Sequence, residues 1–252
     1  MFEARLTQGM ILKKIIEALK DLVTDVNIDC SADGISIQAM DTSHVALVAV
    51  FLRASDFDEF RCDRPQTLGL SLVNMSKIIK CADNDDAITL RAEDEASHMS
   101  FIFEGKKEDK VSEFNLNLLH LDSEHLGIPD QEYDAIATLS SHEFARVCRE
   151  LSQLSDTLSM EVSKEHIRFS VQGDIGNGAV TLKNNESEGT VLEVVDPTSM
   201  SYALRYLNLF NKAATLGDEV KLCLQKDVPL VVHYGFPLGE VKYYLAPKIN
   251  DE

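Results

Sequence analysis

Apolar residues follow two different periods along this chain, and the same order of periods occurs twice. From Thr7 to Lys20 they recur every three or four positions, which predicts an amphipathic helix. Most segments that follow alternate apolar and polar residues as β-strands do, with a second helical pattern between Leu68 and Lys80. After Asp134 the order returns, with helical patterns near Ser141–Gln153 and Leu204–Lys212.

The two halves match at a constant offset, because Leu12 and Phe144 are 132 positions apart (144 − 12 = 132) and other apolar residues keep this spacing. The matched pairs are Ile15 with Val147, Ile16 with Cys148, Leu19 with Leu151, Ile28 with Met160, Ile35 with Ile167, Val48 with Val180, Leu72 with Leu204 and Ile88 with Val220. Matching helical and strand segments in one order predicts two similar domains, residues 1–117 and 135–252, each close to the usual domain length.

The strands are expected to pair as antiparallel hairpins. Asp33-Gly34, for example, is typical of the turn between two strands within Asp25–Met40. Each domain then consists of antiparallel sheets with two helices, which is an α+β fold.

In residues 118–134, between the two halves, the apolar residues follow neither the helical nor the strand period. Gly127 and Pro129 argue against one continuous helix, and acidic residues are scattered among the apolar ones. We interpret Leu118–Asp134 as an interdomain connector whose few apolar side chains are held on another part of the protein.

Composition indicates an intracellular protein. The chain opens without a basic start followed by an apolar run, and its longest apolar run, Val45–Leu52, is far below the ~20 residues that span a bilayer. Five cysteines, odd in number and without a CxxC pair, favour a reducing compartment. No membrane association is expected.

The net charge of −18 argues at first against a nucleic-acid partner, but the basic residues gather on the four predicted helices. Nine of them lie there: Lys13, Lys14, Lys20, Lys77, Lys80, Arg146, Arg149, Arg205 and Lys212. Only three acidic residues, Glu17, Glu143 and Glu150, share these helices, which leaves a formal charge of +6. Exposed lysine is common on any helix, but four such helices on one surface would form a basic stripe.

No catalytic residue, metal site or cofactor is predicted. The glycines of Gly173–Gly178 precede a strand rather than the helix that a phosphate loop needs. His120 and His125 lack helical metal-ligand spacing, and Ser43-His44 lacks an orienting acid. An enzyme with duplicated α+β domains would need a recurring cluster of acidic, His or Cys residues, and none is visible.

Several motifs are specific enough to suggest a family. They are FEARLTQGMILKKIIEALKDL, QAMDTSHVALV, MSKIIKCA, LGIPDQEYD, EFARVCREL, GDIGNG, ALRYLN and KYYLAPKI. Together they resemble the proliferating cell nuclear antigen family of eukaryotic DNA sliding clamps, over essentially the whole chain. The segments Asn184–Gly189 and Gly235–Glu240 depart from that pattern locally.

The resemblance implies a closed homotrimeric ring of six domains in the nucleus, which encircles double-stranded DNA without reading its sequence. The nine helix cations would face the DNA. Residues 111–117 would pair with residues 177–183 of the next subunit, so the implied interface residues are Val111, Phe114, Leu116, Gly178, Val180 and Leu182. By the repeat, residues 45–51 should pair with 241–245 within one chain.

It also implies a docking site for partners that carry a PIP-box, a short helical motif of the type Q-x-x-[ILM]-x-x-[FY]-[FY]. The matching positions are Met40, His44, Val45, Leu47, Leu126, Ile128, Tyr133, Pro229, Tyr244, Ala246, Pro247 and Ile249. Implied partners are DNA polymerase delta, the replication factor C clamp loader, flap endonuclease and DNA ligase. Lys164 matches the family's ubiquitin and SUMO acceptor. A subunit of a heterotrimeric checkpoint-type clamp, which shares the fold, stays open as the alternative.

Overall fold

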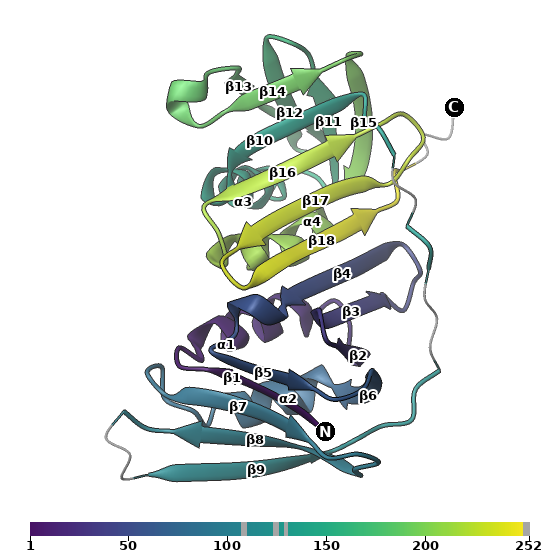
Figure 1. Ribbon diagram of the computed structural model, residues 1–252. Coiled ribbons are helices and arrows are strands. Elements are labelled where there is room, and N and C mark those ends of the chain that lie inside the picture. Colours follow the sequence, from purple (N-terminus) through teal and green to yellow (C-terminus); the bar gives the residue numbers. More distant parts are fainter. Residues whose placement is uncertain (107–109, 123–125, 129–130, 249–252) are drawn as a thin grey trace. The chain divides into compact units, whose positions relative to one another are not determined.

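The computed structural model describes residues 1–106, 110–122, 126–128 and 131–248 (Figure 1). The chain divides into two compact units. Unit 1 comprises Met1–Met40, Val48–Leu126 and Phe236–Val241, and unit 2 comprises Asp41–Leu47, Gly127–Gly235 and Lys242–Glu252.

Unit 1 carries two helices and two antiparallel layers of strands. One layer has the order β5-β1-β7-β8-β9 and the other β4-β3-β2-β6. The strands are β1 (Phe2–Leu6), β2 (Asp25–Ser31), β3 (Gly34–Met40), β4 (Ala46–Arg53), β5 (Glu59–Cys62), β6 (Gln66–Ser71), β7 (Ala87–Ala92), β8 (His98–Glu104) and β9 (Val111–Asn117). The helices α1 (Met10–Leu19) and α2 (Leu72–Ile79) lie against each other, and α2 also contacts β2, β6 and β9.

Unit 2 repeats this arrangement with the strand orders β14-β10-β16-β17-β18 and β13-β12-β11-β15. Its strands are β10 (Ala135–Ser140), β11 (Thr157–Val162), β12 (His166–Gly173), β13 (Gly176–Lys183), β14 (Val191–Val194), β15 (Thr198–Ala203), β16 (Glu219–Leu224), β17 (Leu230–Phe236) and β18 (Gly239–Leu245). The helices are α3 (Ser141–Leu151) and α4 (Leu204–Phe210), the latter continued by a 3₁₀ turn at Asn211–Thr215. The α+β fold with antiparallel sheets and two helices per repeat is confirmed.

The predicted repeat is visible in the strand boundaries. Strands β5, β6, β7 and β8 begin and end 132 residues before β14, β15, β16 and β17, as in 191 − 59 = 132. The last pair differs, since β18 begins 128 residues after β9 (239 − 111 = 128). The cause is a shorter connection: residues 237–238 join β17 to β18, whereas residues 105–110 join β8 to β9.

The cores form from the predicted apolar stripes. Leu12, Ile15, Ile16 and Leu19 of α1 are buried, as are Phe144, Val147, Cys148 and Leu151 of α3. Complete burial of one such large side chain contributes roughly 1.5–3 kcal/mol, so each helix is held by its apolar stripe. Burial also raises the pKa of the Cys148 thiol to about 12, which agrees with its predicted structural role.

Two local predictions were wrong. The first helix begins at Met10 instead of Thr7, because the Thr7 backbone N–H donates to Asp58 Oδ2 (2.6 Å) and the Gly9 N–H donates to Asp86 O (3.2 Å). The hairpin turn lies at residues 32–33, since Ser31 pairs with Gly34. Gly34 is required by packing, because a Cβ there would lie 2.0 Å from Leu52 O and its φ is +147°.

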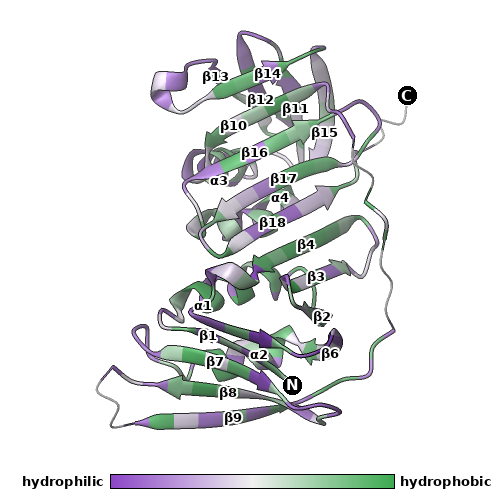
Figure 2. Ribbon diagram, in the orientation of Figure 1, coloured by the Kyte–Doolittle hydropathy of each residue, from purple (hydrophilic) through white to green (hydrophobic). Residues whose placement is uncertain are grey.

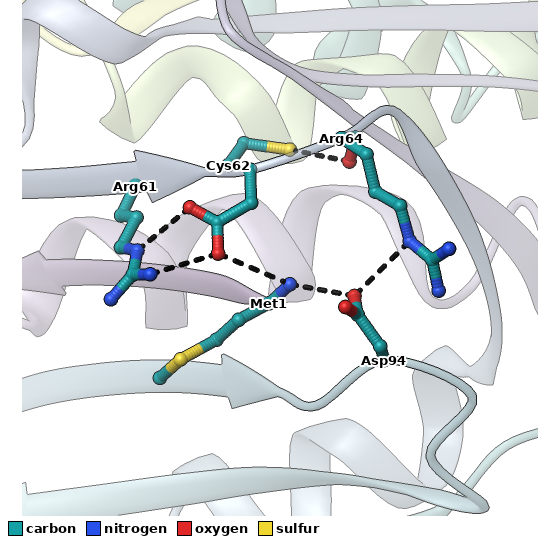
Figure 3. A network of polar contacts seen from close by, with 6 residues as sticks. Met1, Arg61, Cys62, Arg64 and Asp94 are labelled. Carbon is teal, nitrogen blue, oxygen red and sulfur yellow. Dashed lines mark hydrogen bonds and ion pairs between the residues drawn. The ribbon is translucent and has the colours of Figure 1, made fainter.

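The amino terminus is held by a network of ion pairs (Figure 3). The Met1 amine lies 2.6 Å from Asp94 Oδ1 and 3.5 Å from Asp63 Oδ2. Arg61 binds Asp63 through two nitrogens, and Arg64 Nε donates to Asp94 Oδ1 (3.2 Å). These contacts connect the start of β1 to the segments that follow β5 and β7.

Candidate functional site

The basic helix residues of unit 1 differ in how freely they can move. Glu17 binds both Lys20 and Lys80 at 3.3 Å and accepts a hydrogen bond from Ser76 Oγ at 3.0 Å. Burial opposes ionisation of Glu17, but these hydrogen bonds outweigh it and lower the pKa of the carboxyl. Lys13 donates to Ala82 O and to Asn84 Oδ1. Lys77 is exposed and donates within its helix to Asn74 Oδ1 at 3.1 Å.

The basic helix residues of unit 2 are all exposed: Arg146, Arg149, Arg205 and Lys212. Arg146 pairs with Glu143 at 2.7 Å, whereas Arg149 makes no ion pair with an acidic residue in the described part of the chain. Arg205 lies over the Tyr206 ring, 4.7 Å from its centroid. Local acids therefore neutralise some of the predicted cations and leave others, such as Lys77 and Arg149, without such a pair among described residues.

Two long strands end their sheets with an open edge: β9 in unit 1 and β13 in unit 2. Half-buried and exposed residues alternate along β9 and, from Asn177 on, along β13, and Figure 2 shows the matching alternation in hydropathy on β9. Phe114, Leu116, Val180 and Leu182 are among the half-buried residues, while Val111 is 63% exposed. Apolar side chains at an open edge are typical of a strand that pairs with another chain.

The other strand edges in the described residues are short or covered. Strands β5 and β14 have four residues each. The Leu119 N–H donates to Gly69 O on β6 (2.8 Å), and the Lys248 N–H donates to Ser201 O on β15 (2.8 Å). For β4, the Arg53 N–H donates to Leu238 O (3.0 Å) inside unit 1, and Val45 O accepts from the Ala246 N–H (3.1 Å) inside unit 2. These last two bonds lie at the borders of the predicted pairing of residues 45–51 with 241–245, and both have the register of one antiparallel pairing (53 + 238 = 45 + 246 = 291).

The connector is held in part through its backbone, and its apolar residues Leu118, Leu121 and Tyr133 are half-buried. The Leu126 N–H donates to Gln38 Oε1 (2.7 Å) and Gln38 Nε2 donates to Leu126 O (2.9 Å). Leu126 is 45% exposed and Ile128 is 38% exposed, so both present apolar surface. A Cβ on Gly69 would lie 2.2 Å from Leu119 O, which explains why glycine occupies the place where the connector crosses β6.

The predicted docking residues fall in both units. Met40 and Leu126 belong to unit 1, and Ile249 lies outside the described residues. The rest are in unit 2: His44, Val45, Leu47, Ile128, Tyr133, Pro229, Tyr244, Ala246 and Pro247. Leu47 is buried and can act only as a floor, while His44, Pro229 and Ala246 are exposed. Burial raises the pKa of Tyr133, and the nearby Tyr244 adds to that shift.

Sequence reasoning missed the residue that organises the segment 41–46 of unit 2. Asp41 is only 6% exposed, and its carboxylate accepts hydrogen bonds from the backbone of Ser43, Val45 and Ala46 and from the Tyr206 hydroxyl. Aspartate before a polar connection is typical of a turn that bonds its own backbone, and this local signal was available. The partner Tyr206 is 165 residues away and leaves no such signal.

Lys164 lies exposed in the turn between β11 and β12, as predicted for a hairpin turn. The Ser163 N–H donates to His166 O (2.9 Å), and Asn184 Nδ2 donates to Lys164 O (3.0 Å). Residues 174–175 form the turn between β12 and the edge strand β13, so Gly173–Gly178 leads into a strand, as predicted, and not into the helix that follows a phosphate loop.

The described part of the chain contains no group of three or more His, Cys, Asp or Glu residues placed to hold a metal ion. Within it, no helix has the length and apolar character needed to cross a bilayer.

Two family models together match almost the whole chain. Residues 1–125 match the proliferating cell nuclear antigen N-terminal domain, and residues 127–249 match the proliferating cell nuclear antigen C-terminal domain.

Proposed function

The chain belongs to the proliferating cell nuclear antigen family of DNA sliding clamps, and we propose that three copies form a closed ring around duplex DNA. In this proposal β9 of one subunit pairs with β13 of the next. A head-to-tail contact between unlike surfaces gives a closed ring when its rotation closes. The observation that carries the proposal is the presence of two long, open, partly apolar strand edges on one chain.

The helix cations supply the contact with DNA in this proposal. Lysine and arginine that meet phosphates attract the duplex without reading its bases, so a ring lined with them can move along it. The overall charge of −18 does not prevent this, because electrostatic screening at physiological salt acts over ~8 Å.

Native mass and topological retention test the ring. We expect the purified chain to assemble into particles of three times 28.1 kDa, to stay on closed circular DNA and to leave when the circle is cut. If the protein dissociated from the DNA equally fast before and after the circle was cut, encirclement would be contradicted. A chain that trimerises only with two different partners would favour the heterotrimeric checkpoint-type clamp.

A second part of the proposal concerns partner docking. The exposed apolar side chains of Leu126 and Ile128, together with the 41–47 segment and the tail at 246–247, suit the aliphatic and aromatic anchors of a short helical motif. The PIP-box proteins proposed to bind there are DNA polymerase delta, the replication factor C loader, flap endonuclease and DNA ligase.

Leu126→Ala combined with Ile128→Ala should abolish measurable binding of a PIP-box peptide and leave the ring folded. Loss of two anchor contacts of about 1.5–2 kcal/mol each lowers affinity at least a hundredfold. Isothermal titration calorimetry would measure it. The matched control is Ile175→Ala with Val195→Ala, two apolar residues that are 80% and 74% exposed in unit 2. Wild-type affinity in the first variant would place the docking site elsewhere.

We also propose that the protein acts in the nucleus and that Lys164 accepts ubiquitin and SUMO. The exposure of Lys164 in a hairpin turn supports this, since a conjugating enzyme can reach such an amine. Lys164→Arg should remove the modified species from immunoblots of DNA-damaged cells. Modification at an unchanged level would assign it to another lysine.

A further inference from the structure

A chain of polar contacts in unit 2 connects a basic helix residue to the predicted docking loop, which we define as residues 41–46. Arg205 Nη2 donates to the Tyr206 hydroxyl at 3.2 Å, and its guanidinium lies over the same ring. The Tyr206 hydroxyl donates to Asp41 Oδ2 at 2.8 Å. Tyr206 therefore stands between a helix cation that would meet DNA and a carboxylate at the start of the loop.

Asp41 holds the loop through several backbone groups. Its Oδ1 accepts from the N–H groups of Val45 and Ala46, both at 2.8 Å, and its Oδ2 accepts from the Ser43 N–H at 3.1 Å. Burial opposes ionisation of Asp41, but its hydrogen bonds outweigh that effect and lower the pKa of the carboxyl.

The loop needs such support because its backbone is strained. His44 has a φ of +56°, in the left-handed region that residues other than glycine seldom occupy. A conformation of this kind persists only where surrounding contacts enforce it. In this loop the enforcing contacts converge on Asp41, and Tyr206 supplies one of them through its side chain.

We propose that Tyr206 is a positioning residue for the docking loop, and that contact of Arg205 with a DNA phosphate lowers the affinity of this loop for its partners. This inference rests on the proposed function. The Tyr206 hydroxyl accepts from a cation while it donates to an anion, and hydrogen bonds in such a chain strengthen one another. A phosphate that attracts Arg205 removes the first bond and weakens the second. By linkage, partner binding weakens the Arg205–phosphate contact by the same factor.

The chain offers a matched pair of substitutions. Tyr206→Phe removes the hydroxyl and keeps the ring, which packs against Phe210 with centroids 6.4 Å apart. Tyr234→Phe is the control: Tyr234 is also buried in unit 2, and its hydroxyl donates at the same 2.8 Å, but to Asn211 Oδ1. Each variant loses the hydrogen bond that its hydroxyl donates, and only Tyr206→Phe also loses the contact with Asp41 and the bond accepted from Arg205.

The experiment measures the affinity of a fluorescent PIP-box peptide by anisotropy, on the free ring and on rings loaded onto circular DNA and separated from the loader. For the wild type we expect affinity about two- to threefold weaker on DNA. For Tyr206→Phe we expect free-ring affinity about three- to tenfold below wild type and no further change on DNA. Tyr234→Phe should match the wild type in both states.

A second variant tests the cation itself. Arg205→Lys keeps the positive charge but loses the planar group that stacks on Tyr206, so it should also remove the dependence of peptide affinity on DNA. Equal wild-type affinity on and off DNA would overturn the coupling, and Tyr206→Phe behaving as Tyr234→Phe would overturn the positioning role. A wild-type ring that binds no peptide would instead refute the docking function, and this inference with it.

Discussion

Leu116→Asp combined with Val180→Asp should convert the assembly into folded single chains of 28.1 kDa. Leu116 and Val180 are half-buried on the two open strands β9 and β13. Pairing of these strands would enclose both carboxylates in an apolar layer, and an unpaired buried charge costs several kcal/mol. In the separated chain each side chain lies at a sheet edge and stays hydrated. Analytical ultracentrifugation measures the mass, and circular dichroism reports whether the chain remains folded.

The control for this variant places the same charges on the opposite face of the same strands. Asn115 and Thr181 are exposed, and Asn115→Asp with Thr181→Asp should therefore leave the assembly intact. If the Leu116 and Val180 variant kept the wild-type mass, the subunit contact would have to lie away from these strands. If both variants dissociated, added negative charge alone would explain the effect.

Lys77→Glu combined with Arg149→Glu should preserve the trimer and lower retention on DNA by about 10- to 100-fold at physiological salt. Both side chains are exposed on helices, and neither makes an ion pair with a described acidic residue, so reversal disturbs no internal contact of that kind. Lys80 is a weaker choice, because Glu17 already binds it at 3.3 Å. The effect is measured by the lifetime of the loaded ring on circular DNA and by polymerase processivity. The affinity of the variant for DNA should also depend less steeply on salt concentration than that of the wild type.

An equal change of charge on strands provides the comparison. Arg168 on β12 and Lys221 on β16 are exposed, and Arg168→Glu with Lys221→Glu should leave retention close to wild type. Unchanged processivity in the Lys77 and Arg149 variant would contradict a DNA-facing role for these helices. An equal loss in both variants would indicate a general effect of net charge.

The repeated fold was predictable from the sequence because apolar period is a local property. The stripe of Leu12, Ile15, Ile16 and Leu19 specifies both a helix and its buried face, and the same pattern recurs at α3. Turn chemistry was less reliable. Gly34 marks a close approach to Leu52 O at the start of β3, not the turn itself, and spacing alone cannot distinguish the two uses of glycine.

The polar contacts between residues far apart in the sequence were not predictable. Asp41 and Tyr206, or Glu17 and Ser76, meet only after the chain has folded, and single polar residues have no period that reveals their partners. The charge of the helices, likewise, does not show which of the nine basic side chains form ion pairs. The structure separates them: Glu17 binds Lys20 and Lys80, whereas Lys77 and Arg149 make no ion pair with an acidic residue in the described ranges.

The two open strands of this chain, β9 and β13, are unlike, and that difference gives the proposed ring a polarity. A ring in which β9 of each subunit pairs with β13 of the next has no twofold axis perpendicular to its ring axis. Its two faces are therefore different surfaces. Each copy would then present Asp41 and the residues around it toward the same side. A polymerase bound on that side would keep one orientation relative to its direction of movement along the DNA. A ring loaded onto the DNA in the opposite orientation would place the polymerase on the side away from the primer end that it extends.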